Sequence, residues 1–449
     1  MTGSVKNDPR AIRSWITYDW ANSAYATTIL AAVLPAYFAS GVVGDDGVEF
    51  LGRIWTGQDL WAATVGFGPL IMFLVTPILG SIADYSAAKR RFLMVFAIWG
   101  ALVTSLLFFV TSGDVILTMG LFLLADVGFV GANVFYDGLL PDLTTDDTID
   151  MVSSRGFAWG YLGGGIHLLL SLVLIQGADA ELIPIETALA TRIAIGSVGV
   201  WWLVFALKSF RGIPETGQSS ILPGSPRLGW ADYIRIGFSR TVKTTRLVIH
   251  NRPLLVFLVA FILFNDGVQT TIAMASIYAT ETLELGITIV IVAVLLVQFV
   301  AYFGAMGFGR YATRAGTKRA LFTSIVVWGL VTVAAFFLPV GAAAPFLLLA
   351  ILIGFVLGGT QALSRSLYGS MIPEEQSAEF FGFFSVFSKF SAIWGPWIFL
   401  FVRQSTGSAR WAILSIALFF IVGGLLFLTV DIDQARNNRD SLRLTEAVT

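Results

Sequence analysis

Twelve runs of about 20 mostly apolar residues constrain the fold of this chain more than any other feature. A helix needs about 20 residues to cross the hydrocarbon core of a bilayer, where lipid offers no partner for backbone N–H and C=O groups. We therefore predict an all-α integral membrane protein with twelve transmembrane helices. The runs cover residues 15–40, 59–83, 92–111, 114–140, 156–177, 187–207, 253–279, 285–308, 320–339, 344–370, 380–402 and 410–431.

The charge content excludes several classes of function. Only 13% of the residues are charged, about half the fraction found in soluble globules, and a net charge of −1 offers no basic surface for nucleic acid. No lysine follows a glycine, so the phosphate-binding loop that ends in Gly-Lys-Ser/Thr is absent and we expect no nucleotide partner. The chain has no cysteine, and its two histidines, His167 and His250, are far apart. We therefore expect no metal, no cofactor and no catalytic residue.

The distribution of Lys and Arg predicts the orientation. With the N-terminus inside, 22 of the 28 basic residues fall on inner segments, four on outer loops and two within spans. Cytoplasmic loops carry such an excess, so we expect both termini in the cytoplasm. Residues 1–13 are polar and the first apolar run contains Asp19 and Asn22, which indicates a retained first span rather than a cleavable signal. The short loops suit a multi-pass protein of a prokaryotic inner (plasma) membrane.

A single long polar stretch divides the spans into six plus six. The N-terminal bundle, cytoplasmic linker, C-terminal bundle and cytoplasmic tail are predicted at residues 1–207, 208–252, 253–431 and 432–449. Within the linker, apolar residues recur at helical spacing at Trp230, Ile234, Phe238 and Val242. This pattern indicates either a helix lying on the cytoplasmic leaflet or a structured connector.

The two halves also repeat a loop sequence. The loop after the second span reads Gly80-Ser-Ile-Ala-Asp84-Tyr-Ser-Ala-Ala-Lys89-Arg90, and the loop after the eighth span repeats the glycine and the basic pair at Gly309, Lys318 and Arg319. The first loop resembles the signature of the major facilitator superfamily, whose two pseudo-symmetric six-helix bundles enclose a solute cavity at mid-membrane. This resemblance implies that Asp84, with Lys89 and Arg90, latches the cytoplasmic helix ends. In the second loop, Thr313 replaces the aspartate.

Segments spread over almost the whole chain narrow the resemblance. The chain is similar to the autophagy-linked vacuole effluxer family and its bacterial relatives in Tyr18-Asp-Trp-Ala-Asn-Ser-Ala24, Ser153-Ser-Arg-Gly-Phe157, Asp266-Gly-Val-Gln-Thr270, Gln361-Ala-Leu-Ser-Arg-Ser-Leu367 and Ala378-Glu-Phe-Phe-Gly382. Fungal members of that family are linked to amino-acid efflux from the vacuole. The resemblance therefore implies a small polar solute, an amino acid or a similar metabolite.

Polar stripes on the first helix of each half mark a candidate solute or coupling site. Asp19 and Asn22 lie on one face of the first span, and Asp266 and Gln269 repeat that spacing in the seventh. A charge within the bilayer costs about 2.5–3.5 kcal/mol on insertion scales, so such residues should face a cavity or a partner. The alternatives are solute or proton binding, buried interhelical hydrogen bonds, and a gate near Asp19.

Helices ten and eleven carry the remaining charged candidates. Gln361 and Arg365 share one face of helix ten, and the guanidinium can hold a solute carboxylate or pair with Asp137 or Asp266. Asp137 is expected at the inner boundary as an ion-pair or gate residue. On helix eleven, Lys389 could pair with Glu379 or line the solute path, which makes these two residues gate or latch candidates.

Two further residues could relay protons within the membrane. Asp126 lies deeper in helix four than Asp137, and His167 is a lone histidine in helix five. A lone intramembrane histidine titrates near neutral pH and could relay protons, but a hydrogen-bonded packing role for His167 is the favoured alternative.

These residues favour a secondary transporter that works by alternating access and could be proton-coupled. We expect the chain to act as a monomer, with a small-molecule solute and the lipid bilayer as its partners. The alternatives are a membrane-embedded lipid-modifying enzyme, for which clustered catalytic groups are missing, and a non-transporting membrane sensor, for which the tail after Asp431 is short.

Overall fold

A computed structural model describes residues 6–50, 52–216, 230–392 and 394–443. Within this described part, eleven helical segments are long and apolar enough to cross a membrane. The helix α3 (Gly57–Tyr85) lies at the position of the second predicted span and agrees with a total of twelve. The prediction of an all-α, multi-pass membrane protein is therefore confirmed.

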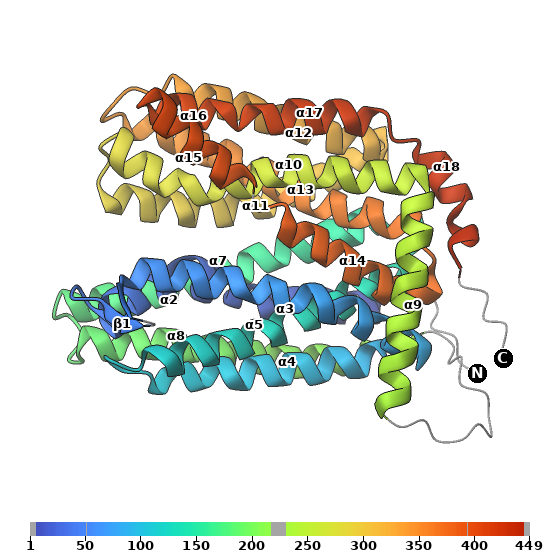
Figure 1. Cartoon of the computed structure of the whole chain (residues 1–449), viewed down its shortest axis with the longest axis horizontal. Coiled ribbons are helices and arrows are strands. Elements are labelled where there is room, and N and C mark those ends of the chain that lie inside the picture. Colours follow the sequence, from blue (N-terminus) through green and yellow to red (C-terminus); the bar gives the residue numbers. More distant parts are fainter. Residues whose placement is uncertain (1–5, 51, 217–229, 393, 444–449) are drawn as a thin grey trace.

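The N-terminal half forms one bundle, drawn from blue to green in Figure 1. Its first span begins as an α-helix and continues through π-helical turns, and a short antiparallel hairpin precedes the second span. Its elements are α1 (Pro9–Ala24), η1 (Tyr25–Ala32), α2 (Val33–Tyr37), η2 (Phe38–Val43), β1 (Val48–Phe50), β2 (Arg53–Trp55), α3, α4 (Lys89–Leu106), η3 (Leu107–Phe109), α5 (Val115–Gly138), α6 (Leu140–Leu143), α7 (Ile149–Asp179) and α8 (Thr187–Phe210).

The C-terminal half forms the second bundle, drawn from yellow to red. Its elements are α10 (Arg252–Ile277), η4 (Tyr278–Thr282), α11 (Ile287–Ala315), α12 (Thr317–Phe336), α13 (Ala343–Met371), η5 (Glu374–Gln376), α14 (Ser377–Phe390), α15 (Trp394–Thr406), α16 (Ala409–Ser415), α17 (Ala417–Leu428), α18 (Ile432–Asn437) and η6 (Arg439–Leu442). Each half packs around its own hydrophobic core.

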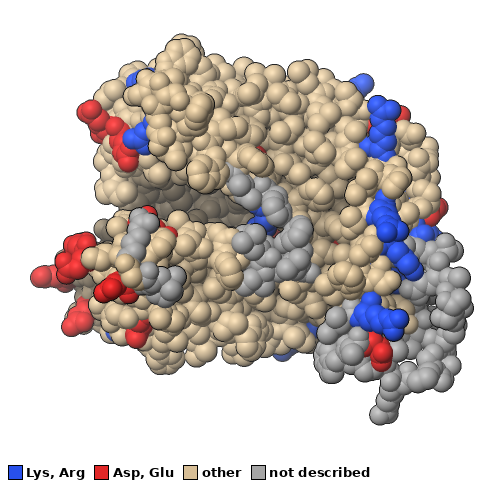
Figure 2. Space-filling view, in the orientation of Figure 1, with Lys and Arg blue, Asp and Glu red and all other residues tan. Residues whose placement is uncertain are grey.

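The outer surface between the two ends of the helices is apolar. Large hydrophobic side chains stay exposed around both bundles, among them Leu170, Val200, Phe303 and Leu425. In Figure 2 the charged side chains gather mostly at the two ends of the molecule, and apart from a basic side chain in the hollow between the bundles the belt between the ends is uncharged. Such a belt fits the hydrocarbon core of a bilayer, which solvates apolar side chains as well as a protein interior does.

One helix of the linker lies across the end of the bundles. Figure 1 shows α9 (Trp230–His250) running roughly crosswise to the membrane helices, at the end where α1 begins and α18 lies. It packs against α3 of the first half and α10 of the second. A helix is therefore present where the linker sequence indicated one, while residues 217–229 lie outside the described part.

The eleventh span differs from the continuous helix expected at residues 380–402. It consists of α14 and α15, which end at Phe390 and begin at Trp394. Pro396 lies in the first turn of α15, where a missing N–H is tolerated, whereas within a longer helix it would remove a hydrogen bond and clash with the preceding turn. The break lets α14 pack against α3 and α5 of the opposite half, while α15 packs against α10 and α16.

Candidate functional site

A cavity of about 450 Å³ lies between the two halves. Figure 2 shows the surface hollowed between the bundles toward the end opposite α9. Helices α1, α5 and α7 supply one wall, and α10, α11, α13 and α14 supply the other. The charged and amide side chains of the lining are Asp19, Asn22, Asn133, Asp137, Asn265, Gln269, Gln298, Gln361, Arg365 and Lys389. Five of the six proposed solute or coupling residues therefore meet in one cavity.

Arg365 is the central charged contact between the halves. Its guanidinium lies 3.0 Å from a carboxylate oxygen of Asp137 and 3.5 Å from one of Asp19. It also donates to the hydroxyl and the backbone carbonyl of Ser153, at 3.0 and 2.9 Å. Asp137 was one of the two ion-pair partners expected for Arg365, and Asp19 is an additional one.

Aromatic rings surround this ion pair. The guanidinium carbon of Arg365 lies 4.1 Å from the ring centre of Phe157 and 4.8 Å from that of Trp15, distances at which a ring face attracts a cation. Tyr136 donates its hydroxyl to Asp19 at 2.9 Å. Two carboxylates face one guanidinium in this cluster, so its ionised form carries an excess negative charge.

Lys389 is the second cation of the cavity. It lines the wall formed by α14, together with Ser385 and Ser388. Among the described residues, no carboxylate forms an ion pair with it. Ser364 of α13 also belongs to the lining, and its buried Oγ has no hydrogen-bond partner in the described part of the chain. The cavity thus presents a cation to whatever enters it.

The amide side chains of the lining are partly held by neighbours. Asn22 donates to the side-chain oxygen of Asn133 at 2.6 Å. The hydroxyl of Tyr161 donates to the side-chain oxygen of Gln361 at 2.5 Å. Because these contacts leave other donors and acceptors of the same amides available, the lining can bind a polar solute without losing its own hydrogen bonds.

Asp266 lies apart from the cavity lining. Its carboxylate accepts hydrogen bonds from the backbone N–H groups of Trp394 and Gly395 at 3.2 and 2.9 Å, and from the hydroxyl of Thr270 at 3.3 Å. It therefore caps the N-terminus of α15, where helices leave N–H groups unpaired. The structure thus separates Asp266 from the five other proposed solute residues and gives it a structural contact.

The two proton-relay candidates also lie outside the lining of the cavity. Asp126 is 4% exposed, and one of its carboxylate oxygens has no partner among the described residues. The ring of His167 contacts the hydroxyls of Thr28 and Ser197 at 3.1 and 3.2 Å. These contacts agree with the packing alternative for His167 and do not connect it to Arg365.

The end of the cavity that faces α9 is closed by a buried ionic network around Lys89. Its ammonium donates to the Asp142 carboxylate at 2.9 Å and to the Ser377 hydroxyl at 2.6 Å, and it lies 3.4 Å from Asp84. Asp84 in turn accepts from the backbone N–H of Glu379 at 2.7 Å. A carboxylate at the N-terminus of α14 also meets the positive end of that helix dipole.

The close packing at this end requires Gly80, which lies four residues before Asp84 in the repeated loop. A side-chain carbon on Gly80 would lie 2.8 Å from the backbone of Glu379, so α3 and α14 touch through their main chains. In the other half, Gly309 faces Ser154 of α7 equally closely. There the carboxylate comes from the facing helix, since Asp150 accepts from Thr317 at 2.6 Å, while Thr313 only donates to its own turn. Both repeated loops therefore have the same close helix contact at the glycine, but the carboxylate lies on the same helix as the glycine in the first half and on the facing helix in the second.

Two further predicted gate or latch residues, Arg90 and Glu379, contact the linker. Arg90 donates to the backbone carbonyl of Phe210 at 2.8 Å, and its N–H donates to Glu215 at 3.0 Å, so it joins the linker to its own half. Burial raises the pKa of Glu215 above its usual range. Glu379 lies 3.6 Å from Arg240 of α9 rather than beside Lys389. The pair proposed between Glu379 and Lys389 is thus replaced by one with the linker helix.

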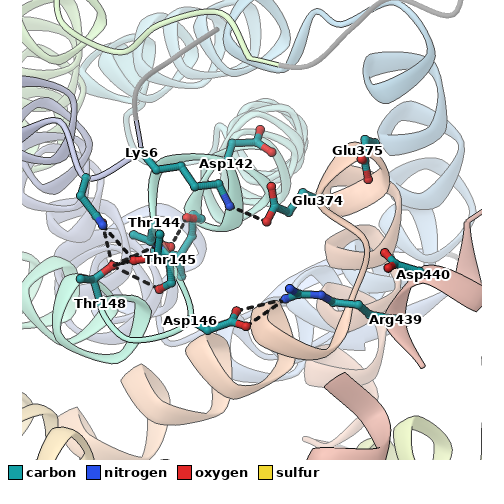
Figure 3. A network of polar contacts seen from close by, with 12 residues as sticks. Lys6, Asp142, Thr144, Thr145, Asp146, Thr148, Glu374, Glu375, Arg439 and Asp440 are labelled. Carbon is teal, nitrogen blue, oxygen red and sulfur yellow. Dashed lines mark hydrogen bonds and ion pairs between the residues drawn. The ribbon is translucent and has the colours of Figure 1, made fainter. Parts of the chain in front are cut away.

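Exposed ion pairs surround this network where the chain ends meet the loops. In Figure 3, Lys6 of the N-terminal segment bonds Glu374 of the second half, and Arg439 of the C-terminal segment bonds Asp146 of the first half at 3.1 Å. Each terminal segment therefore reaches the bundle to which it does not belong.

Comparison with known proteins agrees with this geometry. The family described as "Vacuole effluxer Atg22 like" matches residues 7–440. The chain belongs to the Atg22-like vacuole effluxer family. A relative in this comparison, the uncharacterized MFS-type transporter YxiO of Bacillus subtilis (strain 168), is 31% identical over 445 residues, which cover 97% of this chain and 99% of the relative. Autophagy-related protein 22 of Coccidioides immitis (strain RS) is 24% identical and covers 86% of this chain and 74% of its own.

Solved structures share the fold of this Atg22-like protein. The human organic anion transporter MFSD10 (TETRAN) superposes with a TM-score of 0.70 at 13% identity, covering 94% of this chain and 100% of the other. The major facilitator superfamily transporter FucP in its outward conformation gives 0.66 at 13% identity, covering 94% and 98%. The fold is that of the major facilitator superfamily, and the Atg22-like chain is a membrane transporter.

Sequence reasoning missed several residues of the closure in this Atg22-like protein. Asp142, Asp150 and Glu374 all lie just outside the predicted spans, in short segments where several acidic residues follow one another. Their signal is indirect: carboxylates at the inner end of a protein whose inner loops are strongly basic are candidates for ion pairs. Ser153 gave no such signal, because its contact with Arg365 depends on the packing of the two halves.

Proposed function

We propose that this protein moves a small zwitterionic metabolite, such as an amino acid, across the plasma membrane of a prokaryotic cell by alternating access. One observation carries the proposal: the cavity has the ammonium of Lys389 on one wall, with which no described carboxylate forms an ion pair, and a cluster with excess carboxylate on the other. A solute carboxylate would pair with Lys389, and a solute ammonium with Asp137. A volume of about 450 Å³ is suited to a solute of that size.

The conformation supports a definite step of the cycle. The cavity is closed at the end that holds α9 and both termini, and Lys and Arg predominate in the segments at that end. By the bias of basic residues toward the cytoplasm, this is the inner end, and the conformation is outward-facing. Transport then requires the halves, residues 1–207 and 253–431, to rock about the cavity, which breaks the Lys89 network and separates Arg365 from Asp137.

Coupling to protons is part of the same proposal and centres on Asp19. Two carboxylates share one guanidinium, so the cluster can hold a proton without leaving Arg365 unpaired. Asp19 lies farther from the Arg365 guanidinium than Asp137 does, at 3.5 against 3.0 Å, so its ionised form receives less stabilisation from that cation and we assign the proton to Asp19. Asp266 is not assigned this role because its oxygens already accept backbone hydrogen bonds.

The test is counterflow in proteoliposomes preloaded with unlabelled amino acids, with each labelled amino acid added outside in turn. We expect accumulation of at least one of them, its loss in Lys389→Gln, and retention in Arg403→Gln, which alters only an exposed pair at the outer end. A pH gradient should drive net uptake in the wild type and not in Asp19→Asn. Absence of counterflow for the whole panel, or normal affinity in Lys389→Gln, would refute the solute assignment.

A further inference from the structure

The linker helix α9 uses one face to hold the inner end of the protein together. Its Gly237 approaches α3 so closely that a side-chain carbon there would lie 2.9 Å from Ile78. One turn further along, Thr241 lies 3.4 Å from Ser81, and Arg240 stacks over Tyr85 with 5.8 Å between the guanidinium and the ring centre. This face therefore belongs to the protein interior.

The opposite face of α9 is exposed, and an apolar stripe and a basic stripe run side by side along it. Phe238, Val242 and Ile249 are 61%, 39% and 56% exposed. With a turn of 3.6 residues they fall within an arc of about 40°. The exposed basic residues Arg235 and Arg246 border this stripe on one side, and Lys243 lies beyond them, so that the three cover about 80°. One carboxylate, Asp232, shares the basic side in the first turn of the helix.

We propose that this exposed face of α9 binds anionic phospholipid headgroups of the inner leaflet. The helix lies across the membrane helices at their ends, which places it at the height of the headgroups (Figure 1). There an apolar stripe can enter the acyl boundary while the neighbouring basic stripe meets phosphate groups, an arrangement typical of interfacial helices. Figure 2 shows basic side chains in a row along this end.

Headgroup binding would act on the inner closure through the buried face of the same helix. Arg240 on that face pairs with Glu379 at the start of α14, the helix whose N-terminus also receives Asp84. Anionic lipid that holds α9 against the bundle ends therefore favours the closed inner end. The inference concerns a lipid surface and does not rest on the identity of the solute.

A local quenching experiment tests the binding itself. The chain has no cysteine, so Ile249→Cys can carry a single environment-sensitive fluorophore at the end of the apolar stripe. In nanodiscs of neutral phosphatidylcholine we compare brominated phosphatidylglycerol with brominated phosphatidylcholine at equal mole fraction. Each basic residue near a charged membrane contributes about fivefold in binding, so we expect the anionic quencher to be enriched several-fold around the probe.

Two triple variants identify the side chains responsible. Arg235→Gln/Lys243→Gln/Arg246→Gln should quench equally with both lipids, whereas the matched variant Arg310→Gln/Arg314→Gln/Arg319→Gln removes three exposed charges from the same end and should keep the preference. Equal quenching in the unaltered helix, or a preference that survives the α9 triple variant, overturns the inference. The readout needs no transport, so it fails or succeeds independently of the proposed function.

Discussion

The contact between Arg365 and Asp137 makes a quantitative prediction about the conformational cycle. These side chains come from opposite halves, lie 3.0 Å apart and have 4% and 23% of their side-chain surface exposed. Removing one member of a buried ion pair costs about 3–5 kcal/mol, because the other charge stays behind without a partner. In the proposed rocking cycle the pair forms only while the α9 end is closed, so Arg365→Gln should lose that energy from the closed state alone.

A loss of about 3 kcal/mol corresponds to a shift of about 100-fold or more in the ratio of closed to open molecules. Asp137→Asn should produce a smaller shift, because Arg365 keeps Asp19 at 3.5 Å and Ser153 as partners. Combining the two substitutions should cost less than the sum of the single effects, with a coupling of about 1–3 kcal/mol, as found for residues in one charged network.

Distance measurement between two spin labels follows these populations directly. Cysteines introduced at Arg91 and Arg314, which are exposed on the inner ends of the two halves, give a labelled pair in a cysteine-free background. We expect the longer inner distance to gain population in Arg365→Gln. The exposed pair formed by Arg403 and Glu281 is the control, because its loss should change the ratio by less than about 1 kcal/mol. Additive effects of the Arg365 and Asp137 substitutions would refute the assigned coupling.

Three further predictions concern the contacts around this site. Asp266→Ala should lower the stability of the detergent-solubilised protein by about 1–2 kcal/mol in thermal unfolding, because the cap of α15 is lost. Asp266→Asn should retain most of that stability, because an asparagine can also cap a helix. Equal losses in the two variants would contradict the capping role. Lys89→Met leaves Asp84 and Asp142 buried without their cation, which should weaken the closure. A cysteine introduced at Ser377 should then react faster with an impermeant thiol reagent from the inner side. An unchanged rate would exclude a closing role for the network. Because the pKa of Glu215 is raised by burial, the folded state binds this proton more tightly than the unfolded state, and stability should fall as pH rises from the usual value of 4.5 through the raised pKa. Glu215→Gln should remove that component of the pH dependence in thermal unfolding, and an identical slope in the variant would contradict it.

The placement of the site could be predicted from helical spacing. Asp19 and Asn22, and likewise Gln361 and Arg365, lie three or four residues apart in otherwise apolar spans, so each pair had to share one face. Polar faces within a membrane turn toward a cavity or a partner, and all four residues line the cavity. The sequence could not identify Asp19 as a partner of Arg365, because that contact depends on how closely the halves approach.

Asp266 shows where spacing alone was insufficient. It repeats the pattern of Asp19 in the other half, yet its carboxylate caps a helix that the apolar run at 380–402 did not reveal. Hydropathy reports length and polarity, and it does not register a break within a run that stays mostly apolar. The pair Gly395-Pro396 was the available signal, since proline favours the first turn of a helix over its interior.

The crossed terminal segments have a practical consequence for work with this protein. Lys6 pairs with Glu374 and Arg439 pairs with Asp146, so the segments near both ends of the chain are each held to the opposite bundle by an ion pair. A fluorescent domain or purification tag fused to either end would therefore disturb the ion pair closest to it. Proteins tagged at either end should be compared with untagged protein before any rate is ascribed to the transport cycle itself.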